Sequence, residues 1–352
     1  MDRFRPFLFS LRADAFLVTH LPNVAYLCGF TGSNGVLLVE SSGATLFTDS
    51  RYSLQAAEQL HDAKVSIVSG NLLVAVAERL KRRRSIHLAF SPTQLTVAQK
   101  LSLDAKLGER CKWIDGGNTI ERLRAIKDPA ELAFMREAAK LIDSAWKAGV
   151  RQIKPGVSER SVVAEIEYAI KTAGASGPSF ETIVASGPRS AWAHARPTSK
   201  LLRKNELVVM DQGAILRDYC SDMTRTVFLG RASSRIRRMY HAVLQSQEAA
   251  KFAIRPGVKA GDVDAAARNV LKKHGLARYF THSTGHGLGT EVHEMPRLGR
   301  GDESLLEQGM VVTVEPGVYI EGLGGIRIED DMVVTSNGAE SLTGATREFL
   351  EL

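Results

Sequence analysis

Residues 206–214 read Glu206-Leu-Val-Val-Met-Asp211-Gln-Gly-Ala214, and residues 219–229 read Tyr219-Cys-Ser-Asp222-Met-Thr-Arg-Thr-Val-Phe-Leu229. Each segment has the apolar, β-branched run of a core strand, and the short stretch between them predicts a hairpin. Each also places an aspartate beside its apolar run. A buried carboxylate is unfavourable unless it is paired or binds a metal. The two segments therefore predict both a buried sheet and the place where its chemistry lies.

Two further acids stand beside late apolar runs: Glu315 follows Val311–Val314, and Glu329 follows Ile326–Ile328 within a strand predicted over residues 325–334. For any one acid alone, an ion pair or a strand end is the better explanation. Four such acids beside Thr284-Gly-His286-Gly-Leu-Gly289 favour a metal site, because the glycines let the backbone approach closely and leave the imidazole exposed. The glycine spacing, with no Lys-Ser/Thr after it, argues against a nucleotide-binding loop.

Two aspartates, two glutamates and one histidine are suited to two divalent cations. Oxygen-rich ligation with a single imidazole favours manganese, cobalt or iron over a structural zinc. Paired cations activate water and polarise a carbonyl, and a slightly negative centre attracts a cationic α-amine. The sequence contains neither a Gly-x-Ser-x-Gly elbow nor a His-Glu-x-x-His pair. These residues therefore predict a dinuclear metallohydrolase that acts at a free N-terminus.

The 352 residues predict two domains, at about 150 residues for each domain. The first part alternates between predicted strands, over 14–19, 35–40, 44–48, 64–68 and 86–90, and predicted helices, over 53–60, 72–83 and 93–107. Asp128-Pro-Ala-Glu131 then has the cap, proline and acid of a strong helix start, and this helix runs to about Ala148. Further helices are expected over 158–173 and 262–273. We therefore predict an α/β domain over residues 1–120 and an α+β domain over residues 121–352.

Charge and composition exclude several classes of protein. The net charge of +7 is modest, and Lys81-Arg-Arg-Arg84 follows a predicted helix as a solvated helix end does, so no nucleic-acid partner is expected. No apolar run approaches the roughly 20 residues of a membrane helix, and residues 1–20 do not resemble a signal peptide. The three cysteines are far apart and form no Cys-x-x-Cys motif. We therefore expect no membrane association, no disulfide framework and a cytoplasmic location.

These motifs closely resemble those of the pita-bread metallopeptidases, a family that includes methionine aminopeptidase, aminopeptidase P, prolidase and the non-metal relative creatinase. The matching segments are Asp211–Ala214, Tyr219–Thr226, His282–Gly289, Glu291–Pro296, Val314–Tyr319 and Gly324–Asp331. The earlier segments Asn23–Ser33, Thr48–Tyr52 and Leu123–Glu131 are similar to the proline-specific branch of the family. The resemblance implies a creatinase-like N-terminal α/β domain followed by a pita-bread catalytic domain.

The resemblance also implies the roles of single residues. The metal ligands would be Asp211, Asp222, His286, Glu315 and Glu329, with Asp222 and Glu329 bridging two cations. Manganese is the expected metal, with cobalt, iron and zinc as alternatives. Around the ligands, the resemblance gives catalytic roles to His194, His293 and Glu315, and substrate-binding or supporting roles to His282, Arg327 and Tyr319. The implied substrates are peptides with a penultimate proline, and the implied assembly is a homodimer.

Some alternatives stay open at this stage. The chain could be a non-catalytic binding module on the same fold, or a creatinase-like or phosphonate-ester-cleaving hydrolase. Within the proline-specific branch, a dipeptidase needs a cation for the proline carboxylate, and Arg51, Arg196 and Arg297 are the candidates. We expect an exopeptidase that takes dipeptides well and also accepts tripeptides.

Overall fold

The computed structural model of the protein describes residues 3–352. The chain divides into two compact units, and the division falls between Arg124 and Ala125. The sequence analysis placed the domain boundary between residues 120 and 121, and that boundary stays a prediction. Each unit has its own hydrophobic core and is described by itself.

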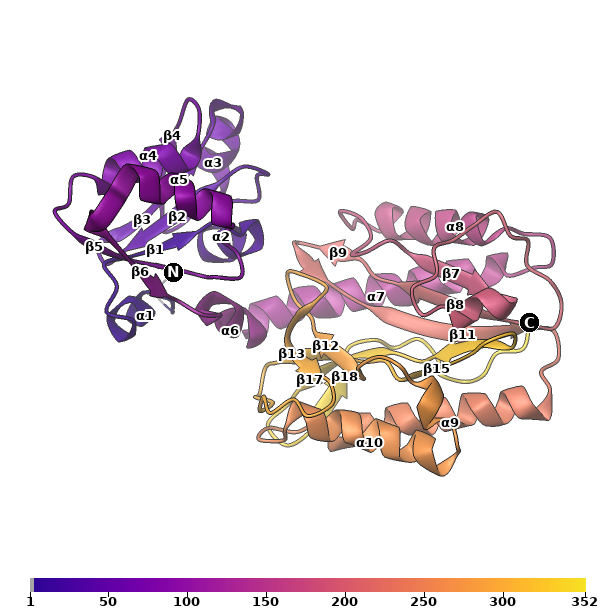
Figure 1. Ribbon diagram of the computed structural model, residues 1–352. Helices are drawn as coiled ribbons and strands as arrows, with labels where there is room; N and C mark the ends of the chain where they lie inside the picture. The colour runs from indigo at the N-terminus through magenta and orange to yellow at the C-terminus, as the bar shows by residue number, and fades with distance from the viewer. Residues whose placement is uncertain (1–2) are drawn as a thin grey trace. The chain divides into compact units, whose positions relative to one another are not determined.

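The first unit is built on a mixed sheet with the strand order β4-β3-β2-β1-β5-β6. The β1–β2 and β2–β3 pairs are antiparallel, and the remaining neighbours are parallel. The strands are β1 (Ala15–Val18), β2 (Val36–Glu40), β3 (Gly43–Thr48), β4 (Lys64–Ile67), β5 (Ile86–Phe90) and β6 (Cys111–Asp115). The helices are α1 (Arg5–Ser10), α2 (Leu21–Cys28), α3 (Ser53–Gln59), α4 (Leu72–Leu80), α5 (Val97–Leu107) and α6 (Thr119–Ala125), the last of which spans the division (Figure 1).

The helix predicted over residues 93–107 begins later than expected. In the structure α5 starts at Val97, because the Thr96 hydroxyl accepts from the backbone N–H of Gln99 and the Gln99 side chain accepts from that of Thr96. This reciprocal pair of bonds is a capping box, and it fixes the first turn of the helix. The short helices α1 and α2 were not predicted.

The second unit places strands between two pairs of helices (Figure 1). The helices are α7 (Pro129–Gln152), α8 (Glu159–Thr172), α9 (Ser234–Ala253) and α10 (Ala260–Lys273). One sheet has the order β11-β8-β7, and a second has the order β13-β12-β14-β17-β18. Their strands are β7 (Ile183–Ser186), β8 (Glu206–Gln212), β11 (Met223–Leu229), β12 (Gly285–Gly287), β13 (Glu294–Leu298), β14 (Val311–Val314), β17 (Asp330–Val334) and β18 (Ala339–Ser341). Two short pairs complete the unit, β9 (Ile215–Leu216) with β10 (Tyr219–Cys220) and β15 (Gly317–Ile320) with β16 (Gly324–Arg327).

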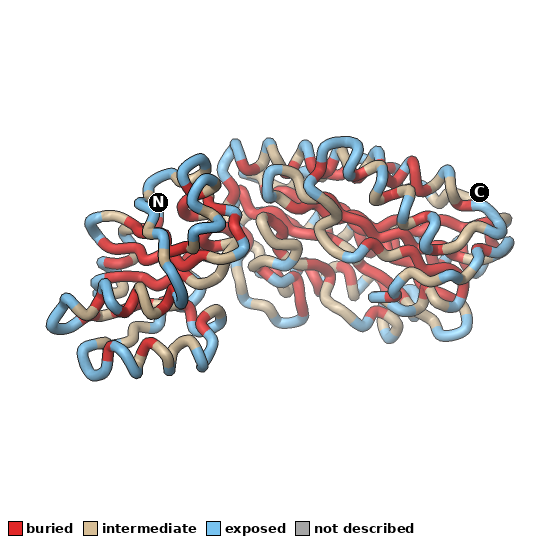
Figure 2. The backbone as a smooth tube through the Cα atoms, turned by 90° about the horizontal axis from the view of Figure 1, so that it is seen from above, coloured by how far each residue is buried: buried red, intermediate tan, exposed pale blue. Residues whose placement is uncertain are grey.

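Alternate residues of β8 enter two different cores. Val208 and Met210 pack with α7 and α8, whereas Leu207 packs with α9 and α10. A strand that is buried on both faces needs a continuous apolar run, as this sequence has. The buried residues follow the strands and one face of each helix (Figure 2). Within residues 3–352, no helix combines the length and the apolar composition that a membrane crossing requires.

Candidate active site

The four acids singled out in the sequence lie at the ends of strands in the second unit. Asp211 is the last residue but one of β8, and Asp222 directly precedes β11. Glu315 follows β14, and Glu329 lies between β16 and β17. Residues 325–334 were expected to form one continuous strand, and the interruption at Ile328 and Glu329 is therefore a difference from the prediction. Strand ends let these carboxylates leave the apolar layer and face one another.

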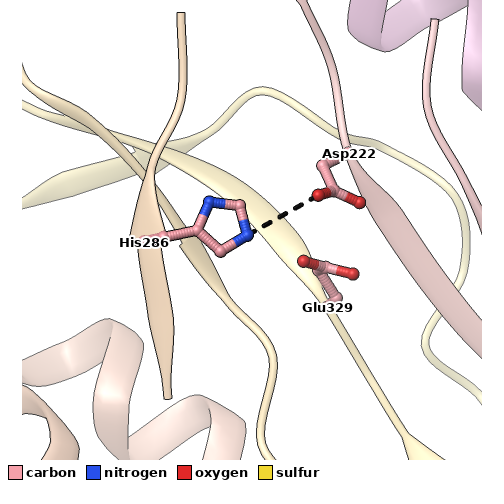
Figure 3. A group of neighbouring side chains, drawn as sticks. All are labelled: Asp222, His286 and Glu329. Atoms are coloured by element: carbon pink, nitrogen blue, oxygen red, sulfur yellow. Dashed lines mark ion pairs between the residues drawn. The ribbon is translucent and has the colours of Figure 1, made fainter. Parts of the chain in front are cut away.

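Asp222, His286 and Glu329 form the most compact part of the site (Figure 3). One potential ligand atom from each lies within 4.8 Å of the others. The His286 Nε2 atom is 3.8 Å from Asp222 Oδ2 and 3.6 Å from Glu315 Oε1. The structure thus brings together residues that are distant in the sequence, such as Asp222 and Glu329.

Close backbone packing explains the glycines on both sides of His286. A Cβ atom on Gly285 would lie 1.9 Å from the backbone oxygen of Thr313, and one on Gly287 would lie 2.0 Å from that of Met295. Both distances are far below any allowed contact, so β12 fits between its neighbours only with glycine at these two positions. The two glycines therefore fix the position of the His286 imidazole, and no larger residue fits at position 285 or 287.

Arg327 joins three parts of the site. Its Nη2 atom donates to Asp211 Oδ2 at 2.6 Å, and its Nε atom donates to the Thr224 hydroxyl at 2.9 Å. Thr224 in turn donates to Glu329 Oε2 at 2.6 Å. The sequence predicted a supporting role for Arg327 and did not specify which metal carboxylate it contacts. In the structure Arg327 contacts Asp211 directly and reaches Glu329 only through Thr224.

Two supporting residues were not recognised in the sequence, Thr224 and Asp331. Asp331 is fully buried, and its Oδ2 atom accepts from the backbone N–H of Asp222 at 3.0 Å. Thr224 pairs with Asp211 in the β8–β11 register, and that pairing was the available signal. For Asp331 the sequence offers only its position two residues after Glu329, because the contact with Asp222 is tertiary.

The residues fit divalent cations in three respects. Asp211 Oδ1 and Asp222 Oδ1 are buried and accept no hydrogen bond from any residue in the described part of the chain. Burial, and then the charge of neighbouring carboxylates, raises the pKa of Asp222 and of Glu315 well above the ordinary values and that of Glu329 to about 8. Burial, and then His293, lowers the pKa of His286 to about 4, so its imidazole is neutral and able to coordinate. Crowded acids beside a neutral imidazole suit cation binding.

A cavity of about 400 Å³ opens over these side chains. His194 and His293 line it together with Asp211, Asp222, His286, Glu315, Arg327 and Glu329. The rings of His286 and His293 lie 4.4 Å apart between centroids. Burial, and then the neighbouring His194, lowers the pKa of His293. His194 and His293 are therefore available to a molecule in the cavity.

His282 and Tyr319 are not among the described residues that line this cavity. Tyr319 accepts from Arg327 Nη1 at 2.8 Å, and its hydroxyl lies 2.9 Å from His282 Nε2. His282 Nδ1 lies 2.8 Å from the Ser283 carbonyl oxygen. Burial, and then Arg327, lowers the pKa of His282 to about 4, so the ring is neutral, with Nδ1–H donating to Ser283 and Nε2 accepting from Tyr319. These two residues extend the hydrogen-bond chain that begins at Asp211.

The comparison with known proteins follows the same division of the chain. Residues 133–336 match the metallopeptidase family M24, and residues 1–126 match the creatinase/prolidase N-terminal domain. The chain belongs to metallopeptidase family M24. The fold class expected from the sequence, an N-terminal creatinase-like domain followed by a pita-bread domain, is thereby confirmed. Membership of a metallopeptidase family implies divalent metal ions.

Three relatives represent the family's proline-specific members. A protein named Xaa-Pro dipeptidase from Pyrococcus furiosus is 35% identical over 99% of this chain and 99% of its own. The structure titled Xaa-Pro dipeptidase from Bacillus anthracis has a TM-score of 0.94 at 36% identity, covering 100% of this chain and 98% of that one. The X-Pro aminopeptidase from Thermotoga maritima has a TM-score of 0.89 at 33% identity, covering 99% of this chain and 100% of that one. Similarity to both kinds of enzyme extends over the whole chain.

Proposed function

We propose that this protein hydrolyses the peptide bond between an N-terminal residue and a penultimate proline, with two manganese ions as its preferred cofactor. The chain is a metallo-exopeptidase of the Xaa-Pro class. The observation that carries the proposal is the convergence of Asp211, Asp222, His286, Glu315 and Glu329 on one cavity. Relatives named for Xaa-Pro hydrolysis match the chain over almost its full length.

In this proposal the five converging residues would hold the cations. When bound, divalent cations supply activation of water and polarisation of the substrate carbonyl. Glu315 accepts the proton of the attacking water at a carboxylate oxygen, because its side chain reaches both His286 and the cavity. Arg327 and Thr224 keep the carboxylates of Asp211 and Glu329 in place through their hydrogen bonds.

The histidines of the cavity wall act on the substrate. His293 lies beside His286 and donates to the oxygen that gains charge during attack. His194 also lines the cavity, where it orients the substrate and is suited to moving a proton. His282 and Tyr319 act indirectly, since their hydrogen bonds lead back to Arg327 and Asp211.

The position of Arg196 supports a preference for dipeptides over longer peptides with a penultimate proline. Arg196 lines the cavity, and its side chain is 84% exposed and forms an ion pair of 3.2 Å with the exposed Glu181. A substrate carboxylate in the cavity can therefore reach it. Arg297 donates to the Ser283 hydroxyl and is not one of the described residues of the cavity wall. A dipeptide ends at the proline carboxylate, so we propose Arg196 as its partner.

The test is hydrolysis of defined substrates by the manganese-loaded protein. An Xaa-Pro dipeptide, the same sequence extended by one to three residues, and creatine are compared at equal concentrations. We expect cleavage of the dipeptide and no reaction with creatine. A specificity constant that rises tenfold or more on extension, or about 1.4 kcal/mol of transition-state binding, would instead make the enzyme an aminopeptidase. Binding without cleavage of any substrate would indicate a non-catalytic module. The homodimer and the cytoplasmic location stay predictions.

A further inference from the structure

The segment between Ser186 and Thr198 carries His194 into the cavity. It leaves β7 at Ser186 and forms one short 3-10 helix over Gly187–Ala191, and its later part includes His194 and Arg196 of the cavity wall. His194 itself is solvent-exposed and lies outside any helix or strand. Its position therefore depends on how the two ends of the segment are held.

A single carboxylate holds both ends. Glu159 is completely buried, and its Oε1 atom accepts from the backbone N–H and from the hydroxyl of Ser186, both at 2.9 Å. Its Oε2 atom accepts from the backbone N–H of Thr198 at 3.0 Å and from the Thr198 hydroxyl at 2.8 Å. One oxygen thus binds the first residue of the segment and the other oxygen binds the last.

Further contacts hold the Glu159 carboxylate in place. Glu159 is the first residue of α8, where the helix dipole favours an acid, and the Arg189 Nε atom lies 3.3 Å from each carboxylate oxygen. Charge-assisted hydrogen bonds of this kind are stronger than neutral ones and fix geometry more tightly. A neutral residue of the same shape cannot accept at both ends, since a glutamine has only one accepting oxygen.

We propose that Glu159 is a positioning residue that holds His194 in place for catalysis, an inference that rests on the proposed peptidase function. Glu159 lies outside the cavity wall as far as the described residues show, so it acts through the segment and not on the substrate. A second anchor exists, because Arg327 Nη1 donates to the Ala193 carbonyl oxygen at 3.0 Å. Loss of Glu159 should therefore misplace His194 without releasing the segment entirely.

A double-mutant cycle between Glu159→Gln and His194→Ala tests this inference. In the otherwise unaltered chain, E159Q should lower kcat/KM for an Xaa-Pro dipeptide about tenfold or more, since small misplacements of catalytic groups have effects of this size. In the H194A background the same change should cost less than twofold. Manganese affinity should stay within twofold, because the carboxylates of the site are held by other contacts. Equal losses in both backgrounds, or no loss in either, would overturn the inference.

Further variants separate a specific effect on His194 from a general loss of charge or structure. Glu165→Gln removes the same charge from a half-buried position on α8 and should leave kcat/KM unchanged. If E159Q does not fold, Thr198→Val removes one of the four bonds at little change in shape and should show a smaller loss with the same coupling to His194. Amide hydrogen exchange of residues 187–198 should be faster in E159Q than in the unaltered protein, and unchanged exchange would overturn the inference. If the unaltered protein cleaves no Xaa-Pro peptide, the proposed function fails, and hydrogen exchange still tests the anchoring.

Discussion

Arg327 shows how a single residue organises the candidate site. Its three nitrogen atoms donate to Asp211, Thr224 and Tyr319 in different directions, and it is almost completely buried. A guanidinium has a rigid fork of donors, whereas an ammonium group is a compact point charge. Charge alone therefore does not account for the choice of arginine at this position.

Arg327→Lys should weaken manganese binding by roughly 10- to 100-fold, the usual cost of losing a partner that orients a ligand. Lysine keeps the positive charge but cannot donate to Asp211, Thr224 and Tyr319 together. Calorimetric titration of metal into the chelated protein measures the change. Arg238→Lys, at an exposed position on α9, serves as the control and should bind metal as the unaltered chain does. Equal metal affinity in both variants would show that only the charge of Arg327 matters.

Unlike Arg327→Lys, the variant His293→Ala should affect turnover and not metal binding. The imidazole lines the cavity, so its removal should lower kcat by roughly 10²- to 10⁴-fold while manganese affinity stays the same. Steady-state kinetics with an Xaa-Pro dipeptide, combined with the metal titration, separates the two effects. An unchanged kcat would remove His293 from the reaction and leave it a structural residue.

Residue types and motifs were sufficient to predict the acids and His286 of the cavity, and the family resemblance implied His194 and His293. They were not sufficient for Thr224 and Asp331, whose contacts with Glu329 and with the backbone of Asp222 join distant segments. The sequence predicted a supporting role for Arg327 but could not specify Asp211 as its partner, because that contact joins β16 to β8. Pairing between strands, and not local pattern, decides such contacts.

At the scale of elements, the short strand β12 positions His286. It lies between β13 and β14 and tolerates no side chain at Gly285 or Gly287. The pairing of β12 with both neighbouring strands therefore fixes the direction of the His286 imidazole.

Gly285→Ala should lower the free energy of unfolding by about 1–3 kcal/mol, because the new methyl group overlaps the backbone oxygen of Thr313. Urea denaturation of the metal-free protein measures this change. Gly338→Ala is the matched control, since its Cβ would meet no described atom within 4 Å and should shift stability by no more than about 0.5 kcal/mol. Equal stability of the two variants would contradict the packing described for β12.

Elements with clear end signals were predicted best. The helix α7 begins where Asp128, Pro129 and Glu131 predicted it, and the capping box is present. The helices α1 and α2 were missed because they are short, with six and eight residues, and offer little periodicity. The break between β16 and β17 was missed because residues 325–334 were taken as one strand, with the acids 329–331 as an interruption of its apolar pattern and not of its backbone. Local signals therefore predict where a long helix starts but not where a buried strand is interrupted.

At the scale of the whole molecule, the crowded acids of the site make the free energy of unfolding depend on pH and on bound metal. The pKa of Glu329 is raised to about 8, and those of Asp222 and Glu315 are also raised, so the metal-free folded chain holds protons that the unfolded chain has lost. The histidines His282, His286 and His293, whose pKa values are lowered, have the opposite effect, but no more than about half of them are protonated in the unfolded chain above pH 6.5. From pH 6.5 to 8 the acids therefore dominate this linkage.

The metal-free protein should become less stable as the pH rises from 6.5 to 8. In this range the raised acids lose their protons in the folded state, and their mutual repulsion then opposes folding. Bound divalent cations remove that repulsion and should flatten or reverse the slope while raising Tm. Thermal unfolding with chelator or with manganese, at several pH values, gives both slopes. A rising stability of the chelated protein over this range would contradict the assignment.

The most direct test of the central claim is a metal titration of Xaa-Pro hydrolysis. The protein is stripped with a chelator, its metal content is checked by elemental analysis, and manganese is returned in steps. The account predicts no hydrolysis of an Xaa-Pro dipeptide without metal and activity that rises until about two equivalents are bound. Full activity in protein shown to be metal-free, or no hydrolysis with two equivalents bound, would contradict it.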